Sequence, residues 1–411
     1  MSNVRVLEGK RIVLGVTGSI AAYKTADLAS RLTQAGALVD VVMTESGAKL
    51  VSPVTFSSLT GRKAYQDHDL WDGSEHVIHI ELGEQNDHFL IAPATANTIG
   101  KLAHGISDNL LTVTALASRT PVIVAPAMDG GMYAHPGTQA NLKVLEERGA
   151  IILGPEGGHL ASGLEGKGRM LEPETLMGHL RMLAGQGGRL SGKKVVITAG
   201  GTQEALDPVR QITNRSSGKQ GYALAQAALD LGAQVSLISG PTCLEPPVGV
   251  QFLPVITAQM MKRAVLDEVQ HADILVMAAA VADFKPVERF QEKIKKESFV
   301  DTTLELSRTG DILKAVAEQK DSGSLGPRIT VGFAAESENL MENAETKLED
   351  KAVEMIVAND ISREDVGFGA DQNQVTILWA DGRVEQLPIM DKFEVAWEVL
   401  GRAAELLASG S

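Results

Sequence analysis

Short apolar runs rich in β-branched residues alternate with amphipathic helical stretches along most of the chain, and few folds are compatible with this alternation. Strands separated by helices pair in parallel, because each helical crossover returns the chain to the same edge of the sheet. The pattern predicts an α/β fold of mostly parallel, doubly wound sheets, flavodoxin-like or Rossmann-like, with helices on both faces. In the first half we expect strands at Arg11–Val16, Leu38–Met43, His88–Ile91, Pro121–Val124 and Ala150–Leu153.

A Gly/Ser-rich stretch at 185–192 (GQGGRLSG) separates these strands from a second set. Because 411 residues exceed one ordinary core, we expect two domains, 1–184 and 193–411, with 185–192 as linker. The last strands, around Asn373 and Asp381-Gly382, predict an antiparallel edge hairpin. The strands expected in this half are Lys194–Thr198, Gln234–Ile238, Val250–Val255, Ile274–Met277, Ile329–Phe333, Met355–Val357 and Val375–Trp379.

Composition narrows the class of protein. A formal net charge of -14, from 38 basic and 52 acidic residues, argues against a general nucleic-acid or anionic-membrane surface. The N-terminal segment has no signal-peptide core, and the longest apolar run, Ile274–Ala282, is far shorter than a membrane span, so we expect a cytoplasmic protein. The single cysteine, Cys243, excludes an internal disulfide and any multi-cysteine metal centre.

The segment 193–221 places a long polar loop between a β-branched run and a helix that we expect to resume at Tyr222. Long loops inside compact domains are usually functional, and helix N-termini and arginines both bind anions. The loop predicts a phosphate or carboxylate site, with a solvated loop and helix cap as the alternative. Its donors are Gly200, Gly201, Thr202, Arg210, Asn214, Arg215, Ser216, Ser217, Gly218 and Lys219.

Four loops of the first half follow strand ends, where parallel sheets bind ligands. They hold the turn Thr17-Gly18-Ser19, Thr44, the run 92–97 (APATAN) and the run 126–129 (PAMD). The glycine turn could cradle a phosphate, but it has the spacing of neither a dinucleotide fingerprint nor a P-loop, so a plain strand-to-helix turn is the alternative. A nicotinamide oxidoreductase is disfavoured, because neither half carries the dinucleotide fingerprint.

The first half resembles the flavin-dependent phosphopantothenoylcysteine decarboxylase family in the segments VTGSIAAYK, VMTESGAKLV, IHIEL, IAPATANTIGKLAHGISDNLL, APAMDGGMY and GGHLASGLEGKGRM, over about residues 8–182. The resemblance implies FMN as cofactor and His79 as the base near the substrate carboxylate or thiol. Judged only from its alternating, strand-like surroundings (VIHIEL), His79 would be an ordinary structural histidine. The resemblance assigns FMN binding to Gly18, Ser19, Thr44, Pro93, Ala94, Thr95 and Asn97.

Two candidate catalytic positions depart from that family's pattern. Asp129 replaces an asparagine that donates to the substrate carboxylate, and it would repel that carboxylate. It could serve only if it is protonated, if a cation such as Lys167 or Arg169 offsets its charge, or if it contacts a different substrate atom. Ser162 replaces the cysteine that donates the last proton, and a hydroxyl is a far weaker acid than a thiol. Three alternatives follow: decarboxylation with altered residues, release of the enethiol, or a flavin-binding relic.

The second half resembles phosphopantothenate-cysteine ligases over residues 190–405, so the whole chain resembles the bifunctional coenzyme A biosynthesis proteins. Gly310 and Ser337 are mild departures. The resemblance implies that CTP converts the pantothenate carboxylate into an acyl-cytidylate, from which the amine of cysteine displaces CMP. Eight blocks carry it, in order: ITAGGTQEALDPVRQITNRSSGKQG, SGP, AAAVADF, KIKK, GDIL, VGFAAES, KLEDK and VANDIS.

The same resemblance assigns residue roles. Lys293 and its neighbours in KIKK would clamp the triphosphate, although such a run is otherwise an ordinary solvated charge cluster. Asn214 would hold the acyl-cytidylate and Arg210 the phosphopantothenate end. Mg²⁺ or Mn²⁺ is expected on the phosphates, with protein ligands that the sequence leaves unknown. The expected CTP pocket comprises Ala278, Ala279, Asp283, Lys293, Gly310, Asp311, Ile312, Leu313, Phe333, Lys347 and Lys351.

We therefore predict an enzyme that ligates cysteine to 4′-phosphopantothenate with CTP in domain 193–411 and decarboxylates the product with FMN to 4′-phosphopantetheine in domain 1–184. The alternative is an active ligase fused to a decarboxylase domain that is impaired, oxidative only, or a flavin-binding module for oligomerisation or regulation. Because the resembling families form trimers and dimers, respectively, we expect a homo-oligomer. Nucleic acids and membranes are not expected partners.

Overall fold

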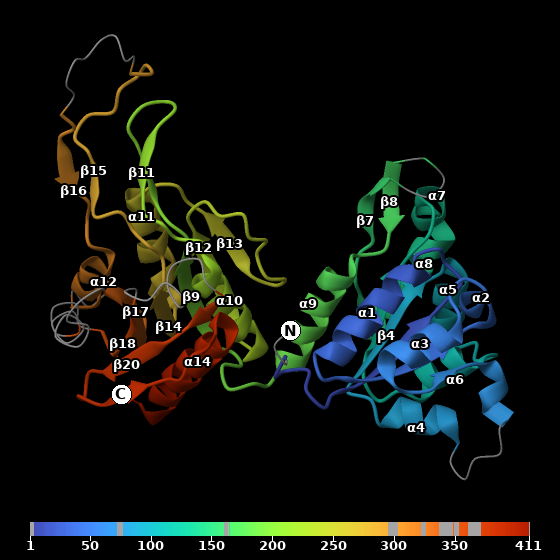
Figure 1. The fold of residues 1–411 in the computed structure, drawn as a ribbon. Coiled ribbons are helices and arrows are strands. Elements are labelled where there is room, and N and C mark those ends of the chain that lie inside the picture. The colour runs from blue at the N-terminus through green and yellow to red at the C-terminus, as the bar shows by residue number, and fades with distance from the viewer. Residues whose placement is uncertain are drawn as a thin grey trace. The chain divides into compact units, whose positions relative to one another are not determined.

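The computed structural model describes residues 4–71, 77–159, 163, 165–294, 303–321, 326–336, 348, 353–360 and 371–410. The chain forms two compact units, Met1–Ala184 (unit 1) and Gly185–Ser411 (unit 2) (Figure 1). Each unit is built on a mostly parallel sheet, which confirms the predicted fold class. None of the described helices combines the length and the apolar composition that a membrane span needs.

Unit 1 contains a six-stranded sheet in the order β3-β2-β1-β4-β5-β6, and all of its strand pairs are parallel. The five strands predicted in this half are present, but three described strands were missed: the two-residue β3 of this sheet and the two strands of a separate ribbon, β7 (Glu156–His159) and β8 (Glu165–Arg169). The strands are β1 (Arg11–Val16), β2 (Leu38–Met43), β3 (Ala64–Tyr65), β4 (His88–Ala94), β5 (Val122–Pro126) and β6 (Ile151–Ile152).

Helices cover both faces of this sheet, because its strands are apolar on both sides. In β1, Ile12 and Leu14 belong to one buried cluster and Val13 to the other, as the alternation along a strand requires. The first cluster packs against α1 (Ala22–Gln34), α3 (Pro53–Thr60) and α9 (Pro173–Gly185), and the second against α4 (Ile78–Glu84), α5 (Ala96–His104), α6 (Leu110–Ala117) and α8 (Pro136–Glu147).

The stretch VIHIEL, predicted to be strand-like, is instead the start of helix α4, so that prediction was wrong. The strand-like prediction came from the alternation of apolar residues in this stretch. In the helix, Ile78 and Leu82 lie four residues apart and pack on the core, whereas Ile80 is 42% exposed. Gly83 allows the helix to approach α6, since a Cβ there would lie 2.9 Å from the backbone of Ala117.

Unit 2 contains an eight-stranded sheet in the order β13-β12-β9-β14-β17-β18-β20-β21, in which only β20 and β21 run antiparallel to their neighbours. The edge hairpin turns near Asp381-Gly382 as predicted, but Asn373 lies on a separate two-stranded ribbon of β19 (Gln372–Asn373) and β22 (Met390–Asp391). The strands are β9 (Lys194–Ala199), β12 (Gln234–Ser239), β13 (Gln251–Pro254), β14 (Ile274–Met277), β17 (Ile329–Glu336), β18 (Met355–Asp360), β20 (Val375–Trp379) and β21 (Val384–Gln386).

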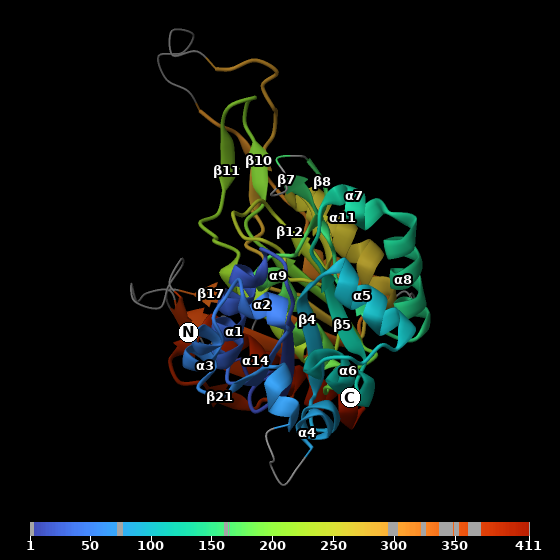
Figure 2. The same cartoon turned by 90° about the vertical axis from the view of Figure 1, so that its right-hand side faces the viewer.

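Helices also cover both faces of the unit 2 sheet. The helices α10 (Lys219–Asp230) and α14 (Lys392–Ser409) pack on one face, and α11 (Ala258–Glu268) and α12 (Ile312–Asp321) pack on the other. α10 begins three residues before the predicted Tyr222, after Gly218 with a φ of 76°. Two ribbons, β10 (Gln203–Ala205) with β11 (Gln211–Thr213) and β15 (Phe284–Pro286) with β16 (Leu306–Arg308), stand out from the sheet (Figures 1 and 2).

Candidate functional site

The loops after β1 and β4 are joined at the carboxyl ends of the unit 1 strands. The hydroxyl of Thr17 donates to the carbonyl of Pro93 (2.6 Å) and accepts from the amide of Thr95 (3.1 Å). Thr95 also caps α5 by accepting from the amide of Thr98, so the N-terminus of a nine-residue helix opens beside these loops. Asn97 is exposed in the first turn of that helix.

The loop after β2 completes this group of loops. Thr44 caps the short helix α2 (Glu45–Ala48) by accepting from the amide of Gly47 at 3.1 Å. A Cβ on Gly18 would lie 2.5 Å from that of Ser46, so only glycine fits there. We call the loops that hold Gly18, Ser19, Thr44, Pro93, Ala94 and Thr95 the cradle. Its hydroxyls, turn amides and helix N-terminus suit a phosphate, so the residues present fit a phosphate-bearing cofactor such as FMN.

A cavity of about 490 Å³ lies beside the loop after β5. It is lined by Asp129, by parts of α7 (Gly130–Ala134) and α8, and by Glu165 and Lys167 of β8 (Glu165–Arg169). Asp129 caps α7, because its Oδ1 accepts from the amide of Gly131 at 2.9 Å. β8 pairs with β7 (Glu156–His159) in an antiparallel ribbon. Ser162, the second departure, lies between these strands and outside the described residues.

His79 lies on α4, away from the cradle. Glu81 and Gln85, which follow it, contact the guanidinium of Arg11, the first residue of β1. The helix therefore lies at the amino-terminal edge of the sheet, and Figures 1 and 2 draw it at the opposite end of unit 1 from α7. Nδ1 of His79 is enclosed and has no hydrogen-bond partner among the described residues. The structure does not bring His79 to the cradle within one unit.

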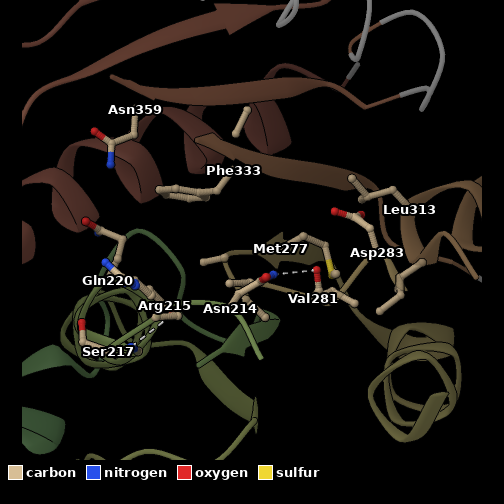
Figure 3. A pocket seen from close by; sticks show the side chains of 18 of the residues that line it. Asn214, Arg215, Ser217, Gln220, Met277, Val281, Asp283, Leu313, Phe333 and Asn359 are labelled. Atoms are coloured by element: carbon tan, nitrogen blue, oxygen red, sulfur yellow. Dashed lines mark hydrogen bonds between the residues drawn. The ribbon is translucent and has the colours of Figure 1, made fainter. Parts of the chain in front are cut away.

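Unit 2 has a cavity of about 940 Å³ lined by residues of β17, by the carboxyl end of β18 and by the loop after β14 (Figure 3). It gathers Asn214 and most of the residues predicted to bind CTP, which together come from four separate segments of the chain. In Figure 3, Phe333 and Asn359 lie on one side, the start of α10 on another, and Asp283 and Leu313 at the far end. The predicted residues that line the cavity are Asn214, Ala278, Ala279, Asp283, Gly310, Asp311, Ile312, Leu313 and Phe333.

Side-chain hydrogen bonds fix the loop after β14 that forms one wall of this cavity. The hydroxyl of Thr198, which is fully buried, accepts from the amides of both Ala278 and Ala279 at 3.1 Å. Asn214 donates to the carbonyl of Val281 at 3.0 Å, as the dashed line in Figure 3 marks. Both contacts join segments about 70 to 80 residues apart, so the wall is set by tertiary structure.

The cavity contains cations that the sequence analysis missed or did not assign. Lys392, at the start of α14, is half-buried in its wall, and burial followed by the charge of Lys219 lowers the pKa of Lys392. Lys219 Nζ lies 2.6 Å from Asp371 Oδ1. Asn359, at the end of β18, was also missed, and its buried Oδ1 has no hydrogen-bond partner among the described residues. No local motif marks Lys392, whereas Asn359 lies in the VANDIS block, to which the sequence analysis assigned no binding role.

Arg210 and Lys293 do not line this cavity. Arg210 donates to the carbonyl of Ile294 at 3.2 Å, and the amide of Ile294 donates to Asp207 at 3.3 Å. These bonds join the turn of the β10–β11 ribbon to the segment 284–294, and we call the two together the arm. Several apolar side chains on the arm and on β16 are exposed: Val209 (66%), Val287 (59%), Phe284 (47%) and Leu306 (45%).

The predicted Lys347 and Lys351 lie outside the described residues. Within the parts of the chain that the structure describes, no group of three or more His, Cys, Asp or Glu side chains is arranged to hold a metal ion. The described residues therefore assign no ligands to the expected divalent cation.

Fold and cavities together define a two-unit α/β protein with the cradle in one unit and a cavity of about 940 Å³ in the other. Residues 1–185 match the family described as "Flavoprotein", and residues 190–407 match "DNA/pantothenate metabolism flavoprotein C-terminal domain". The coenzyme A biosynthesis bifunctional protein CoaBC of Bacillus subtilis is 46% identical over 404 residues, 98% of each chain, and that of Escherichia coli is 42% identical over 379 residues, 92% of each. The chain belongs to the family of coenzyme A biosynthesis bifunctional proteins CoaBC.

Two solved structures are similar to one unit each. The C-terminal domain of a CoaBC protein is 42% identical and covers 54% of this chain and 98% of its own, with a TM-score of 0.46. A cysteine-to-serine mutant of a PPC decarboxylase, complexed with pantothenoylaminoethenethiol, is 35% identical and covers 43% of this chain and 98% of its own, with a TM-score of 0.40.

Proposed function

We propose that the chain performs two consecutive steps of coenzyme A biosynthesis: unit 2 joins cysteine to 4′-phosphopantothenate with CTP, and unit 1 decarboxylates the product with FMN to 4′-phosphopantetheine. The observation that carries this proposal is the relationship to CoaBC proteins over almost the whole chain, at 46% identity to the Bacillus subtilis protein. The cradle in unit 1 and the large cavity in unit 2 supply one site for each step.

In unit 2 the substrate carboxylate attacks the α-phosphate of CTP and releases pyrophosphate, and the cysteine amine then displaces CMP from the acyl-cytidylate. Phe333 would stack on the base. Lys219, Lys392 and the start of α10 supply positive charge for the phosphates. Asn214, held by the carbonyl of Val281, would orient the acyl group. A divalent cation, Mg²⁺ or Mn²⁺, would screen the triphosphate.

In unit 1 the cradle would hold the FMN phosphate, and the 490 Å³ cavity beside Asp129 would take the cysteine end of the substrate. FMN would accept two electrons from the thiol side of the substrate, which makes loss of CO₂ possible, and would return them to the resulting enethiol, so that the overall reaction is redox-neutral. His79 would serve as the base. Ser162, or a water that it positions, would provide the last proton, and we expect this step to be slow because a hydroxyl is a weak acid.

The same geometry supports a homo-oligomer. His79 and the cradle lie at opposite ends of the unit 1 sheet, so we propose that His79 acts on the cradle of another copy, in a trimer. Exposed apolar side chains occur at both ends, with Trp71 (86%) and Val77 (59%) near α4 and Ile20 (65%) and Tyr23 (62%) after the glycine turn. For unit 2 we propose a dimer in which Arg210 and Lys293 of the arm reach the cavity of the second copy.

The first experiment tests both steps in one tube. Full-length protein with FMN, phosphopantothenate, CTP, Mg²⁺ and cysteine is analysed by mass spectrometry beside a Ser162→Cys variant and a reaction without CTP. We expect phosphopantetheine with both proteins, faster with Ser162→Cys, and none without CTP. Accumulation of phosphopantothenoylcysteine alone would refute the decarboxylase step, and unreacted phosphopantothenate would refute the ligase step.

The proposed dimer is tested by mixing two inactive variants, Arg210→Ala and Asn214→Ala, under conditions that exchange subunits. If Arg210 acts in the second copy, each mixed dimer contains one intact site, so random exchange should restore about a quarter of wild-type ligase activity. If Arg210 acts within its own chain, mixing restores nothing. Each variant alone is the control for residual activity.

A further inference from the structure

The cavity beside Asp129 contains one lysine that no step has used. Its charged lining residues are Asp129 on the loop after β5 and Glu165 and Lys167 on β8. We propose that Lys167 binds the carboxylate that the decarboxylation removes and compensates for the aspartate at position 129. This inference rests on the proposed function, because it takes phosphopantothenoylcysteine as the substrate.

Asp129 cannot bind the substrate carboxylate by itself. An ionised carboxylate has only acceptors, and its Oδ1 already accepts from the amide of Gly131. A substrate carboxylate entering the same cavity therefore meets like charge, which disfavours binding unless a cation lies nearby. An ammonium provides both the donors and the charge that an aspartate lacks.

The backbone fixes Lys167 close to Asp129. The amide of Met128 donates to the carbonyl of Gly168 at 3.0 Å, so the residues next to Asp129 and next to Lys167 are hydrogen-bonded to each other. A Cβ on Gly168 would lie 2.1 Å from the carbonyl oxygen of Met128, so β8 packs directly on this loop. The position of Lys167 is thus a property of two ordered segments, although its side chain is exposed.

Among the charged side chains near Asp129, Lys167 is the one placed to bind the substrate carboxylate. Arg169, two residues further along β8, is bonded to Glu172 and does not line the cavity. Glu165 lines it, but its side chain is 75% exposed and lies 3.2 Å from His159, so solvent screens its charge. Among the described residues, no carboxylate forms an ion pair with Lys167.

Binding of two ligands that differ by the carboxylate tests the proposal without requiring turnover. Isothermal titration of the FMN-loaded full-length protein, with His79→Asn introduced into every protein so that the proposed base is absent and the ligand is not consumed, would compare phosphopantothenoylcysteine, which carries the carboxylate, with phosphopantetheine, which lacks it. The variants are Lys167→Met, Asp129→Asn and the double variant, with Arg169→Met as the matched control on the same strand. A charge-assisted contact predicts about tenfold or more weaker binding of phosphopantothenoylcysteine to Lys167→Met, with phosphopantetheine binding unchanged.

Asp129→Asn should tighten binding of the carboxylate ligand, and adding Lys167→Met to it should cost less than the same change in the wild type, because the repulsion is gone. Arg169→Met should leave the difference between the two ligands unchanged. The proposal is overturned if Lys167→Met weakens both ligands equally or neither. If the wild type binds phosphopantothenoylcysteine but releases no CO₂, the decarboxylase function fails while this comparison still decides the role of Lys167.

Discussion

Replacing Thr198 by valine keeps the shape of a fully buried side chain and removes one hydroxyl. That hydroxyl accepts from the amides of Ala278 and Ala279, both at 3.1 Å. A buried donor left without a partner costs about 1–3 kcal/mol. Both amides are half-buried at the cavity wall, where water can reach them, so the lower part of that range applies to each. We expect Thr198→Val to lower the free energy of unfolding of unit 2 by about 2–3 kcal/mol.

The matched control is Thr198→Ser, which keeps the acceptor and loses one buried methyl group, at a cost of about 1 kcal/mol. Urea unfolding of the full-length protein can be followed by tryptophan fluorescence, because Trp379 is buried in unit 2 while Trp71 of unit 1 is 86% exposed. Thr198→Val should also raise the KM for CTP more than Thr198→Ser does. If the two variants unfold at the same urea concentration, the hydroxyl does not hold the loop and the reasoning is refuted.

Three further substitutions test the two units separately, through a close backbone contact in unit 1 and through one charged side chain in each unit. Gly168→Ala places a Cβ 2.1 Å from a backbone oxygen and should impair decarboxylation but not ligation. The control is Gly157→Ala on the paired strand, where the added Cβ has no atom within 4 Å, and it should leave both rates unchanged. Lys392→Met should raise the KM of a ligase substrate about tenfold, while decarboxylation of supplied phosphopantothenoylcysteine stays normal. A hydrogen bond from Lys24 lowers the pKa of Glu172. The Lys24–Glu172 pair therefore stabilises the folded state above a pH of about 4, and this stabilisation is lost as the pH falls through the lowered pKa of Glu172. Glu172→Gln should therefore destabilise unit 1 by about 1–2 kcal/mol at pH 7 and flatten the acid side of its melting profile.

The sheets and the cradle were predictable because their causes are local or topological. Continuous β-branched runs such as 11–16 and 274–277 mark buried parallel strands, and both match the structure residue for residue. The placement of the cradle follows from topology, since loops after parallel strands must meet at one edge of the sheet. The close approach of Gly18 to Ser46 then explains why that turn contains glycine.

The remaining features depend on tertiary contacts that no local pattern reveals. Helix α4 has only seven residues, so alternation and helical spacing fit its sequence almost equally well, and packing on α6 decides between them. Lys392 reaches the unit 2 cavity from the first turn of the last helix, far along the chain from the loop at 214–221. Lys293 was predicted to join the CTP site and Arg210 to hold the phosphopantothenate end, but the arm holds both outside the cavity of their own unit.

The stretch 185–192 shows how composition can suggest a property that packing contradicts. Its glycines are typical of a flexible connection, yet a Cβ on Gly188 would lie 2.5 Å from the carbonyl oxygen of Leu231, and one on Gly185 would lie 2.6 Å from that of Leu229. Leu190, in the same stretch, is fully buried, and its amide donates to Leu231 at 2.8 Å. These glycines therefore allow close packing on the end of α10. Since a flexible linker would leave its apolar residue exposed and its amides in water, residues 185–192 form part of the body of unit 2.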